Sequence, residues 1–334
     1  MTPKQRLLAT IRGEEHDRVP VTPIVMQWAA HHIGRSYRDY YLNGQCLAAG
    51  QLAVMRDFHT DWVSVMSDPW CEASAFGMAF DWPEESVGVP RGHLIQSPAD
   101  ARKLTVFDPH AHDRPRERLA CIRAERAAVG DDVAVFGWVE GPLAEYADLR
   151  GLEDACIDLM DDPATFHAAA EVIVENAIHF AREQVAAGAD FIGVGDAACS
   201  VIGPDLYREH VWPWERKLFA GIHDAGALVK LHICGNIAPL LPMLAEVGAD
   251  ILDVDYMVPL DQARAAVGDQ VTLCGNFDPV AALKDSTPAA IAAAAQRCID
   301  AAGGPRSRFI LQPGCEVPPG TPAEHLHAFC PPSS

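Results

Sequence analysis

A histidine and a cysteine two residues apart, His232 and Cys234, end an apolar run that begins at Ala227. On a β-strand, residues i and i+2 point to the same face, so this imidazole and this thiol project together. Imidazole nitrogen and thiolate sulfur are the ligand types that tetrahedral zinc sites prefer. One His-x-Cys pair is half of such a site, so a metal-binding interpretation depends on what the rest of the chain places beside it.

The composition is that of an acidic globular protein. The chain has 334 residues, 49% of them hydrophobic, and 46 acidic residues against 26 Lys and Arg give a net charge of -20. A surface of this sign repels phosphate backbones and anionic lipid. We therefore expect neither nucleic acid nor a membrane among the partners of this chain.

The sequence carries no secretion signal that we recognise. Residues 1–6 lack an apolar signal-peptide core, and no run reaches the roughly 18 apolar residues of a membrane span. The ten cysteines are not packed at the density of a secreted disulfide scaffold. These features predict a protein of the reducing cytoplasm.

Eight extended runs alternate with helical segments along the chain, which predicts parallel strands joined by helical crossovers. Eight such units in about 300 residues indicate a (β/α)8 TIM barrel, here one domain spanning 1–334. Proline-rich residues 76–110 form a loop-rich excursion after the second strand. An open doubly wound sheet is the alternative, but no Gly-x-Gly-x-x-Gly motif supports it. The expected strands are 19–26, 62–68, 133–140, 191–196, 228–234, 251–255, 271–274 and 309–312.

In a barrel of this type, reactive residues lie at the carboxyl ends of the strands. Three soft zinc ligands fall there: His232, Cys234 and, on a Pro/Gly turn after the last strand, Cys315. Three protein ligands with an open fourth position are typical of a catalytic zinc. The remaining polar residues at these ends are Asp68, Glu140, Asp196, Asp255, Cys274 and Asn276.

Several of these residues have simpler interpretations. Asp68 and Asp196 can each cap the helix that follows, and Cys274 is better suited to packing than to metal binding. Asp255 can serve as a displaceable fourth zinc ligand. Trp28, near the end of the first predicted strand, is expected in the core or in a pocket wall.

Three motifs carry a resemblance to a known family. They are His-Ile-Cys-Gly-Asn at 232–236, Cys-Gly-Asn-Phe-Asp-Pro at 274–279, and Pro-Gly-Cys-Glu-Val-Pro at 313–318. The chain resembles the uroporphyrinogen decarboxylase superfamily, and within it the zinc-dependent corrinoid methyltransferases, which include methylcobalamin:coenzyme M methyltransferases. The similarity runs from the opening helix to Pro322.

The resemblance implies a (β/α)8 barrel in which His232, Cys234 and Cys315 bind zinc. It also implies a methylated corrinoid as co-substrate, presented by a separate corrinoid protein or as free cobalamin, and a small thiol, pterin or methylated compound as the other substrate. A homodimer is one assembly that this interpretation allows. Under this hypothesis Asp68, Glu140, Asp196 and Asp255 contribute to catalysis around the mouth, while Trp28, Asn236 and Asn276 contact the substrate.

Two other activities stay open. One is decarboxylation of a porphyrinogen, although the decarboxylases carry a Met-Arg-Gln-Ala-Gly-Arg signature where this chain has Met26-Gln27-Trp28-Ala29-Ala30, with Arg35 as its nearest arginine. The other is the reverse methyl transfer, from a methyl ether or methylamine to the corrinoid, in which zinc acts as a Lewis acid on the leaving heteroatom.

Overall fold

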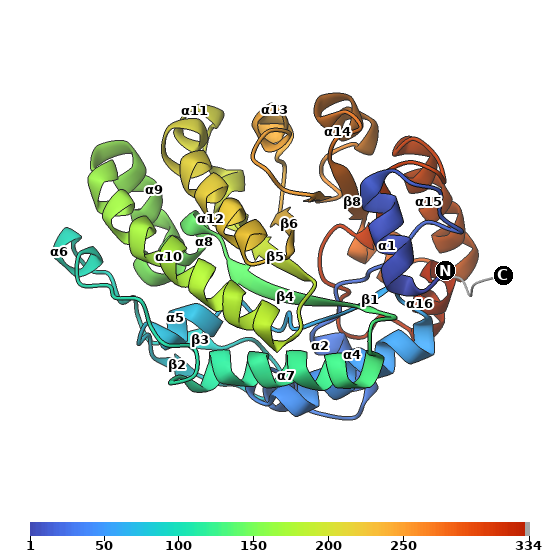
Figure 1. Ribbon diagram of the computed structural model, residues 1–334, viewed down its shortest axis with the longest axis horizontal. Coiled ribbons are helices and arrows are strands. Elements are labelled where there is room, and N and C mark those ends of the chain that lie inside the picture. The colour runs from blue at the N-terminus through green and yellow to red at the C-terminus, as the bar shows by residue number, and fades with distance from the viewer. Residues whose placement is uncertain (331–334) are drawn as a thin grey trace.

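The computed structural model of the protein describes residues 1–330, which fold around a curled parallel sheet with helices on its outer face (Figure 1). The sheet has seven strands in the order β1-β4-β5-β6-β7-β8-β9. Seven of the eight predicted strands are thereby confirmed. Their bounds are β1 Trp62–Ser64, β4 Ala134–Glu140, β5 Phe191–Gly195, β6 Leu228–Ile233, β7 Ile251–Val254, β8 Thr272–Phe277 and β9 Phe309–Pro313.

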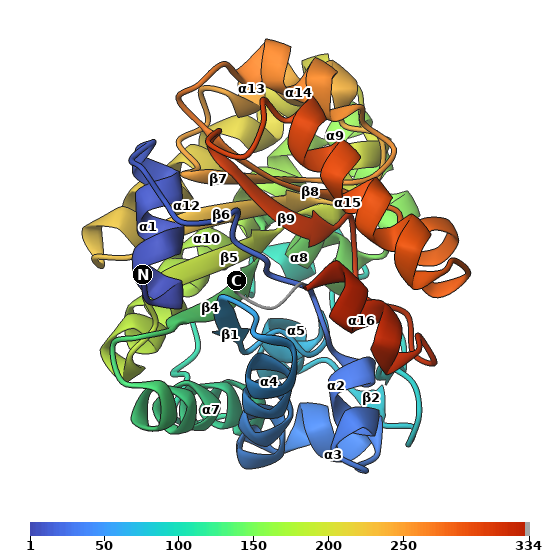
Figure 2. The same ribbon diagram turned by 90° about the vertical axis from the view of Figure 1, so that its right-hand side faces the viewer.

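The remaining predicted strand, 19–26, which is the first in chain order, is not a strand of this sheet. The closed eight-stranded barrel is therefore not confirmed. The segment passes between β9 and β1 (Figure 2) and forms one isolated parallel bridge, Val21 to Leu311. On its other side the Asp61 N–H donates to the Val21 carbonyl at 2.9 Å. Pro20 and Pro23 lack an N–H and interrupt the ladder, which is the physical reason for the difference.

Helices surround the strands and follow the expected alternation with them. None of the helices within residues 1–330 is both long enough and apolar enough to cross a membrane. The longer helices are α1 Pro3–Arg12, α4 Gly44–Phe58, α7 Asp113–Val129, α8 Pro142–Arg150, α9 Leu152–Asp161, α10 Pro163–Ala187, α12 Trp212–Asp224, α14 Leu260–Val267 and α15 Pro288–Ala301. Shorter ones include α2 Gln27–His32, α3 Tyr37–Leu42, α5 Cys71–Ala75, α6 Pro98–Ala101, α11 Pro204–Leu206, α13 Leu241–Leu244 and α16 Ala323–Phe329.

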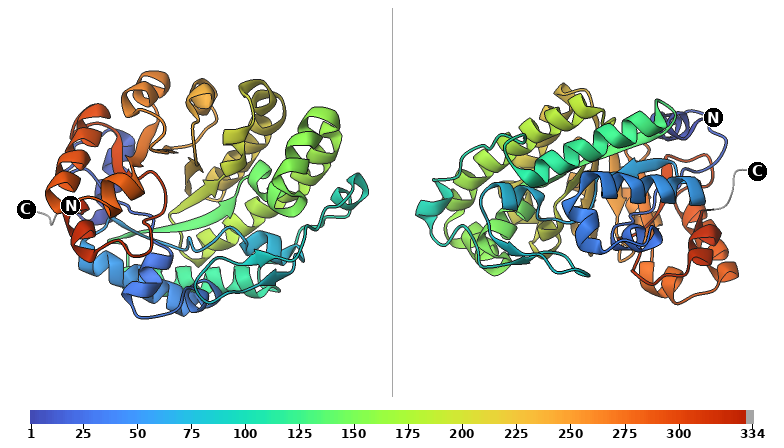
Figure 3. Two further views of the ribbon diagram at one scale, coloured as in Figure 1. Left: turned by 180° about the vertical axis from the view of Figure 1, so that it is seen from behind. Right: turned by 90° about the horizontal axis from the view of Figure 1, so that it is seen from below.

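The segment 76–110 departs from the alternating pattern, as predicted. It holds a small antiparallel pair, β2 Phe80–Asp81 with β3 Val89–Pro90, outside the main sheet, and the short helix α6. After it the chain enters α7, which lies beside α4 (Figure 3). Gly44 makes this approach close, since a Cβ there would collide with the backbone carbonyl of Glu117.

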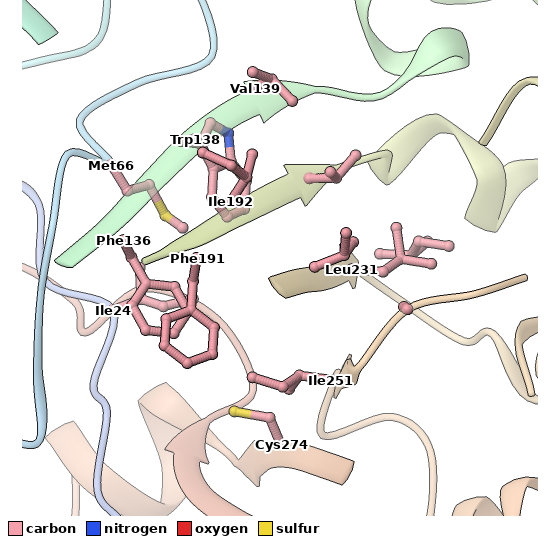
Figure 4. Packing of buried hydrophobic residues seen from close by; sticks show 14 of the residues in the cluster. Ile24, Met66, Phe136, Trp138, Val139, Phe191, Ile192, Leu231, Ile251 and Cys274 are labelled. Carbon is pink, nitrogen blue, oxygen red and sulfur yellow. The ribbon is translucent and has the colours of Figure 1, made fainter. Parts of the chain in front are cut away.

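Inside the sheet, aromatic side chains form a layer beneath the carboxyl ends of the strands. Phe136 of β4 and Phe191 of β5 stack with ring centroids 4.4 Å apart, and Met66 and Trp138 lie close by (Figure 4). The ring of Trp138 occupies the space where a side chain at Gly195 would begin, 2.6 Å from the point that a Cβ there would take. Glycine at this strand end therefore lets an indole lie flat across the neighbouring strand.

Candidate metal centre

Strands β6 and β9 bring the three predicted zinc ligands together. The ligand atoms of His232, Cys234 and Cys315 all lie within 4.8 Å of one another. His232 Nε2 is 2.9 Å from Cys234 Sγ, which is 3.9 Å from Cys315 Sγ. The two cysteines are 81 residues apart in the chain, and the curl of the sheet brings the ends of β6 and β9 together across β7 and β8.

A buried carboxylate orients the histidine from below. Asp253 of β7 is the register partner of His232. Its Oδ2 lies 3.0 Å from His232 Nδ1 and 2.6 Å from Lys230 Nζ, and accepts a hydrogen bond from Gln312 Nε2 at 2.6 Å. Burial alone would raise the pKa of Asp253, but Lys230 and His232 lower it to about 2. Asp253 therefore stays ionised and turns Nε2 of the imidazole toward the two sulfurs.

The donor set fits a zinc ion. Bonds of about 2.3 Å to sulfur and 2.1 Å to nitrogen in a tetrahedron place the donors roughly 3.5–3.8 Å apart, and the separations of 2.9 and 3.9 Å lie on either side of that range. In the metal-free protein, the Cys234 thiol and then His232 lower the pKa of Cys315 to about 4. A histidine whose other nitrogen faces a carboxylate is also the usual arrangement at protein zinc sites.

A small cavity of about 180 Å³ opens beside the three donors. Its walls come from the ends of several strands and from the loop after β9. Most of its lining is apolar, and within residues 1–330 neither lysine nor arginine contributes to it. The lining residues are Ile24, Met26, Met66, Asp68, Pro69, Trp138, Glu140, Gly195, Ala197, His232, Cys234, Cys315 and Glu316.

Two of the predicted catalytic carboxylates, Asp68 and Glu140, line this cavity. Asp68 Oδ2 pairs with Arg114, and although burial would raise the pKa of Asp68, this arginine and then Arg118 hold it below its usual value. Glu140 Oε1 accepts a hydrogen bond from Trp138 Nε1 at 2.8 Å. Burial, and then the nearby carboxyl of Glu72, raise the pKa of Glu140 well above its ordinary value.

The other two predicted catalytic carboxylates do not line the cavity. Asp196 accepts hydrogen bonds from the backbone N–H groups of Leu143 and Ala144, at 3.4 and 2.6 Å, and so caps α8. The alternative prediction, a helix cap, describes this geometry, although the capped helix precedes Asp196 in the chain. Asp255 accepts the N–H groups of Gly235 and Met257 at 2.9 and 3.0 Å. It thus ties the loop after β6 to the loop after β7.

The predicted substrate contacts also lie away from the cavity wall. Trp28 is buried and donates its indole N–H to the Thr321 carbonyl at 2.8 Å. Asn236 is exposed and accepts the Ala238 N–H at 3.1 Å, which makes it a turn residue. Asn276 donates through its amide to the Val258 carbonyl at 2.5 Å. Each side chain supports a loop around the rim.

Four residues of the site were not predicted: Lys230, Asp253, Gln312 and Glu316. The first three carry polar groups into strands that are otherwise apolar, and Lys230 shares a strand face with His232. A buried charge in such a strand was the available signal. Glu316 lines the cavity next to Cys315, and burial raises the pKa of Glu316 to about 7.

A second cluster of potential metal donors joins the segment after β5 to helix α12. Asp196, Cys199 and Glu215 are all buried, with ligand atoms within 4.8 Å of one another. Tyr207 donates its hydroxyl hydrogen to Glu215, and burial raises the pKa of Asp196 to about 6. Together with the backbone bonds to α8, these contacts make the cluster a link between helices.

Comparison with known proteins supports the resemblance. A statistical model of the uroporphyrinogen decarboxylase (URO-D) family matches residues 2–331. A uroporphyrinogen decarboxylase of Anaeromyxobacter dehalogenans is 30% identical, over 97% of this chain and 96% of that one. A methylcobamide:CoM methyltransferase of Methanosarcina barkeri is 26% identical, over 98% and 96%.

A solved structure agrees with these sequence relatives. A methyltransferase from Methanosarcina mazei superimposes with a TM-score of 0.89 at 26% identity, covering 98% of this chain and 97% of the other. The predicted family is therefore confirmed. The chain belongs to the uroporphyrinogen decarboxylase family.

Proposed function

We propose that this protein is a zinc-dependent methyltransferase that moves a methyl group between a corrinoid and a small thiol. The main observation that supports this proposal is a set of one nitrogen and two sulfur donors that opens to a small cavity. The donors belong to His232, Cys234 and Cys315. Relatives named methylcobamide:CoM methyltransferase and methylated-thiol–coenzyme M methyltransferase, of similar length, support the same reaction class.

A zinc ion held by these donors would lower the pKa of a thiol bound at its open position, so that the thiol ionises at neutral pH. The protein supplies the setting for that chemistry. Asp253 holds the imidazole orientation, and the apolar walls, including Met66 and Trp138, keep water away from the sulfur. The thiol proton leaves to solvent. A corrinoid at the rim would supply the methyl group: its Co–C bond would break with the electron pair left on cobalt, and a C–S bond would form on the thiolate.

The size of the cavity supports separate positions for the two substrates. A volume of about 180 Å³ holds a small thiol but not a corrin macrocycle. The corrinoid would thus stay at the rim and point its methyl group inward, delivered by a separate corrinoid protein or as free cobalamin. We further infer that residues 1–330 act as one domain, with the segment 19–26 filling the eighth position of the ring.

Porphyrinogen decarboxylation is less compatible with this cavity. A substrate with several carboxylates needs cationic partners, yet within residues 1–330 the only charged side chains in the wall other than His232 are acidic. Arg35, the arginine nearest to the position of the decarboxylase signature, is exposed and lies at a separate hollow with Asp39 and Asn43.

The test combines metal analysis with a turnover assay on the purified protein. We expect about one zinc per chain, because three protein ligands form one catalytic zinc site. We also expect methyl transfer from methylcobalamin to a thiol acceptor, and this activity should be abolished by a chelator and restored by zinc. Turnover of uroporphyrinogen by the metal-free protein, without any methyl transfer, would overturn the proposal.

A further inference from the structure

The largely apolar wall of the cavity beside the three donors holds three acidic side chains and, across residues 1–330, no lysine or arginine able to receive an anionic substrate. Asp68, Glu140 and Glu316 line it from three different loops or strand ends. His232 belongs to the donor set, and neither lysine nor arginine from the described part of the chain reaches the lining. Any charged end of a small substrate would therefore meet carboxyl groups, and a cation bound beside them would favour their ionised forms.

The nearest cations are already paired with other groups. Arg114 is buried, bonds Asp68, and lies over the rings of Tyr41 and Trp82, with centroid distances of 5.6 and 5.4 Å. Lys230, also buried, is 2.6 Å from Asp253, below the imidazole. An anion in the cavity would lose its hydration without gaining a charged partner, which is costly.

Glu140 and Glu316 are each anchored through one oxygen. Glu140 Oε1 accepts the Trp138 indole N–H at 2.8 Å, and Glu316 Oε1 accepts the Gln27 backbone N–H at 3.0 Å. A carboxylate has about four acceptor positions, so both groups keep capacity for a donor on a ligand. They reach the cavity from segments that are far apart in the sequence: Glu140 ends β4, and Glu316 follows Cys315.

We propose that the methyl acceptor is a small thiol without negative charge, and that a positively charged amino end, held by Glu140 and Glu316, is preferred. This inference rests on the proposed methyl transfer and names its substrate class. The cavity volume of about 180 Å³ is comparable with that of an engineered protein cavity of about 150 Å³ that binds benzene. An acceptor of only a few heavy atoms is therefore expected.

Three thiols of one shape test the charge preference. Cysteamine, 2-mercaptoethanol and 2-mercaptoethanesulfonate (coenzyme M) share the HS–CH2–CH2 unit and end in a cation, a hydroxyl and an anion. With the zinc-loaded protein and methylcobalamin, we expect kcat/KM to fall in that order, by about tenfold or more from first to last, since placing like charges together costs several kcal/mol.

Variants separate charge recognition from the intrinsic reactivity of each thiol, which is the same for every enzyme form. Glu140→Gln and Glu316→Gln should each lower the cysteamine to coenzyme M ratio of kcat/KM by about fivefold or more, because each replaces a carboxyl group that ionises beside a bound ammonium with a neutral amide. The exposed Glu153 on α9 offers a matched control, and Glu153→Gln should keep the ratio unchanged. Zinc content shows whether the donor set beside Glu316 is intact, and Glu140 tests the idea from a different strand.

The outcomes are distinguishable. If coenzyme M is the better acceptor, or if neither variant changes the ratio, the charge inference is overturned while methyl transfer stands. If the zinc-loaded protein methylates none of the three thiols, the proposed function is overturned and this inference with it.

Discussion

On the β6–β9 side of the cavity, the buried charges are balanced. Asp253 is shared by Lys230, His232 and Gln312 at 2.6–3.0 Å. On the β1–β4 side, five carboxyl groups face two guanidinium groups. Burial raises the pKa values of four of them, and nearby carboxyl groups add to the rise. The five are Asp68, Glu72, Glu140, Glu145 and Asp148, and the two cations are Arg114 and Arg118.

The difference shows a division of tasks within one rim. A network in which each charge has a partner holds its atoms in fixed positions, as a metal centre requires. Carboxyl groups in excess instead retain capacity for an external donor, and their protonation depends on pH. We therefore expect changes on the donor side to remove metal and activity, and changes on the acidic side to alter selectivity and pH dependence.

The largest effect is expected from Cys315→Ser. A serine hydroxyl is a poor zinc ligand, so zinc should fall far below one per chain, and methyl transfer should fall by more than the about 100-fold that loss of a ligand-orienting residue can cause. Elemental analysis and the methylcobalamin assay measure both. Cys156→Ser, at a half-buried thiol on α9, is the matched control and should retain metal and activity. Full zinc content in Cys315→Ser would refute the ligand assignment.

Asp253→Asn should have the next largest effect. The substitution leaves Lys230 buried without its counter-charge and the imidazole without its carboxylate. We expect zinc affinity to fall by about 10–100-fold and the free energy of unfolding by about 3–5 kcal/mol. Competition with a chelator and denaturant unfolding provide the measurements. Asp261→Asn, on the exposed surface of α14, serves as the control, and equal behaviour of the two variants would contradict the role assigned to Asp253.

How far these residues were predictable follows from what a sequence pattern contains. Apolar runs between helical segments are local, and seven strands were predicted from them; 19–26 failed because its prolines remove donors that a ladder needs. His232, Cys234 and Cys315 were predictable because parallel strands bring their carboxyl ends to one rim. The role of Asp253 was not predictable, because it depends on the register that places Asp253 opposite His232. That register cannot be read from the sequence.

The carboxyl groups on the β1–β4 side should affect how the free energy of unfolding depends on pH. Neither oxygen of Glu145 has a hydrogen-bond partner within residues 1–330, and burial, then the nearby Asp148 and Glu72, raise its pKa. A raised pKa means that the folded state holds a proton that the unfolded state releases. The stabilisation is complete below the ordinary glutamate pKa of about 4.3 and is lost as pH rises toward the folded pKa.

Glu145→Gln removes that titration. The decline of the unfolding free energy above about pH 5 should become shallower, by up to about 1.4 kcal/mol per pH unit for one proton. Denaturant unfolding from pH 5 to 9 measures the slope. Glu153→Gln, exposed on α9, should keep the slope of the unaltered protein. The same steep decline in Glu145→Gln would mean that other groups bind the proton.

The smallest effect is expected at Asp255, where two roles compete. As a displaceable zinc ligand, its loss would lower zinc affinity; as a loop tie, its loss would loosen the turn that carries Cys234. The structure engages both carboxylate oxygens with the N–H groups of Gly235 and Met257. An asparagine has one carbonyl oxygen, so Asp255→Asn gives up one of these bonds, worth about 1 kcal/mol.

We therefore expect Asp255→Asn to retain about one zinc per chain, the stoichiometry of a three-ligand site, and to lose about fivefold in methyl transfer, the factor that 1 kcal/mol represents. Asp255→Ala, which gives up both bonds, should lose more activity but still bind zinc. If zinc binding by Asp255→Asn weakens as much as in Asp253→Asn, Asp255 belongs to the metal site. The metal-binding side of the rim would then include the loop after β7.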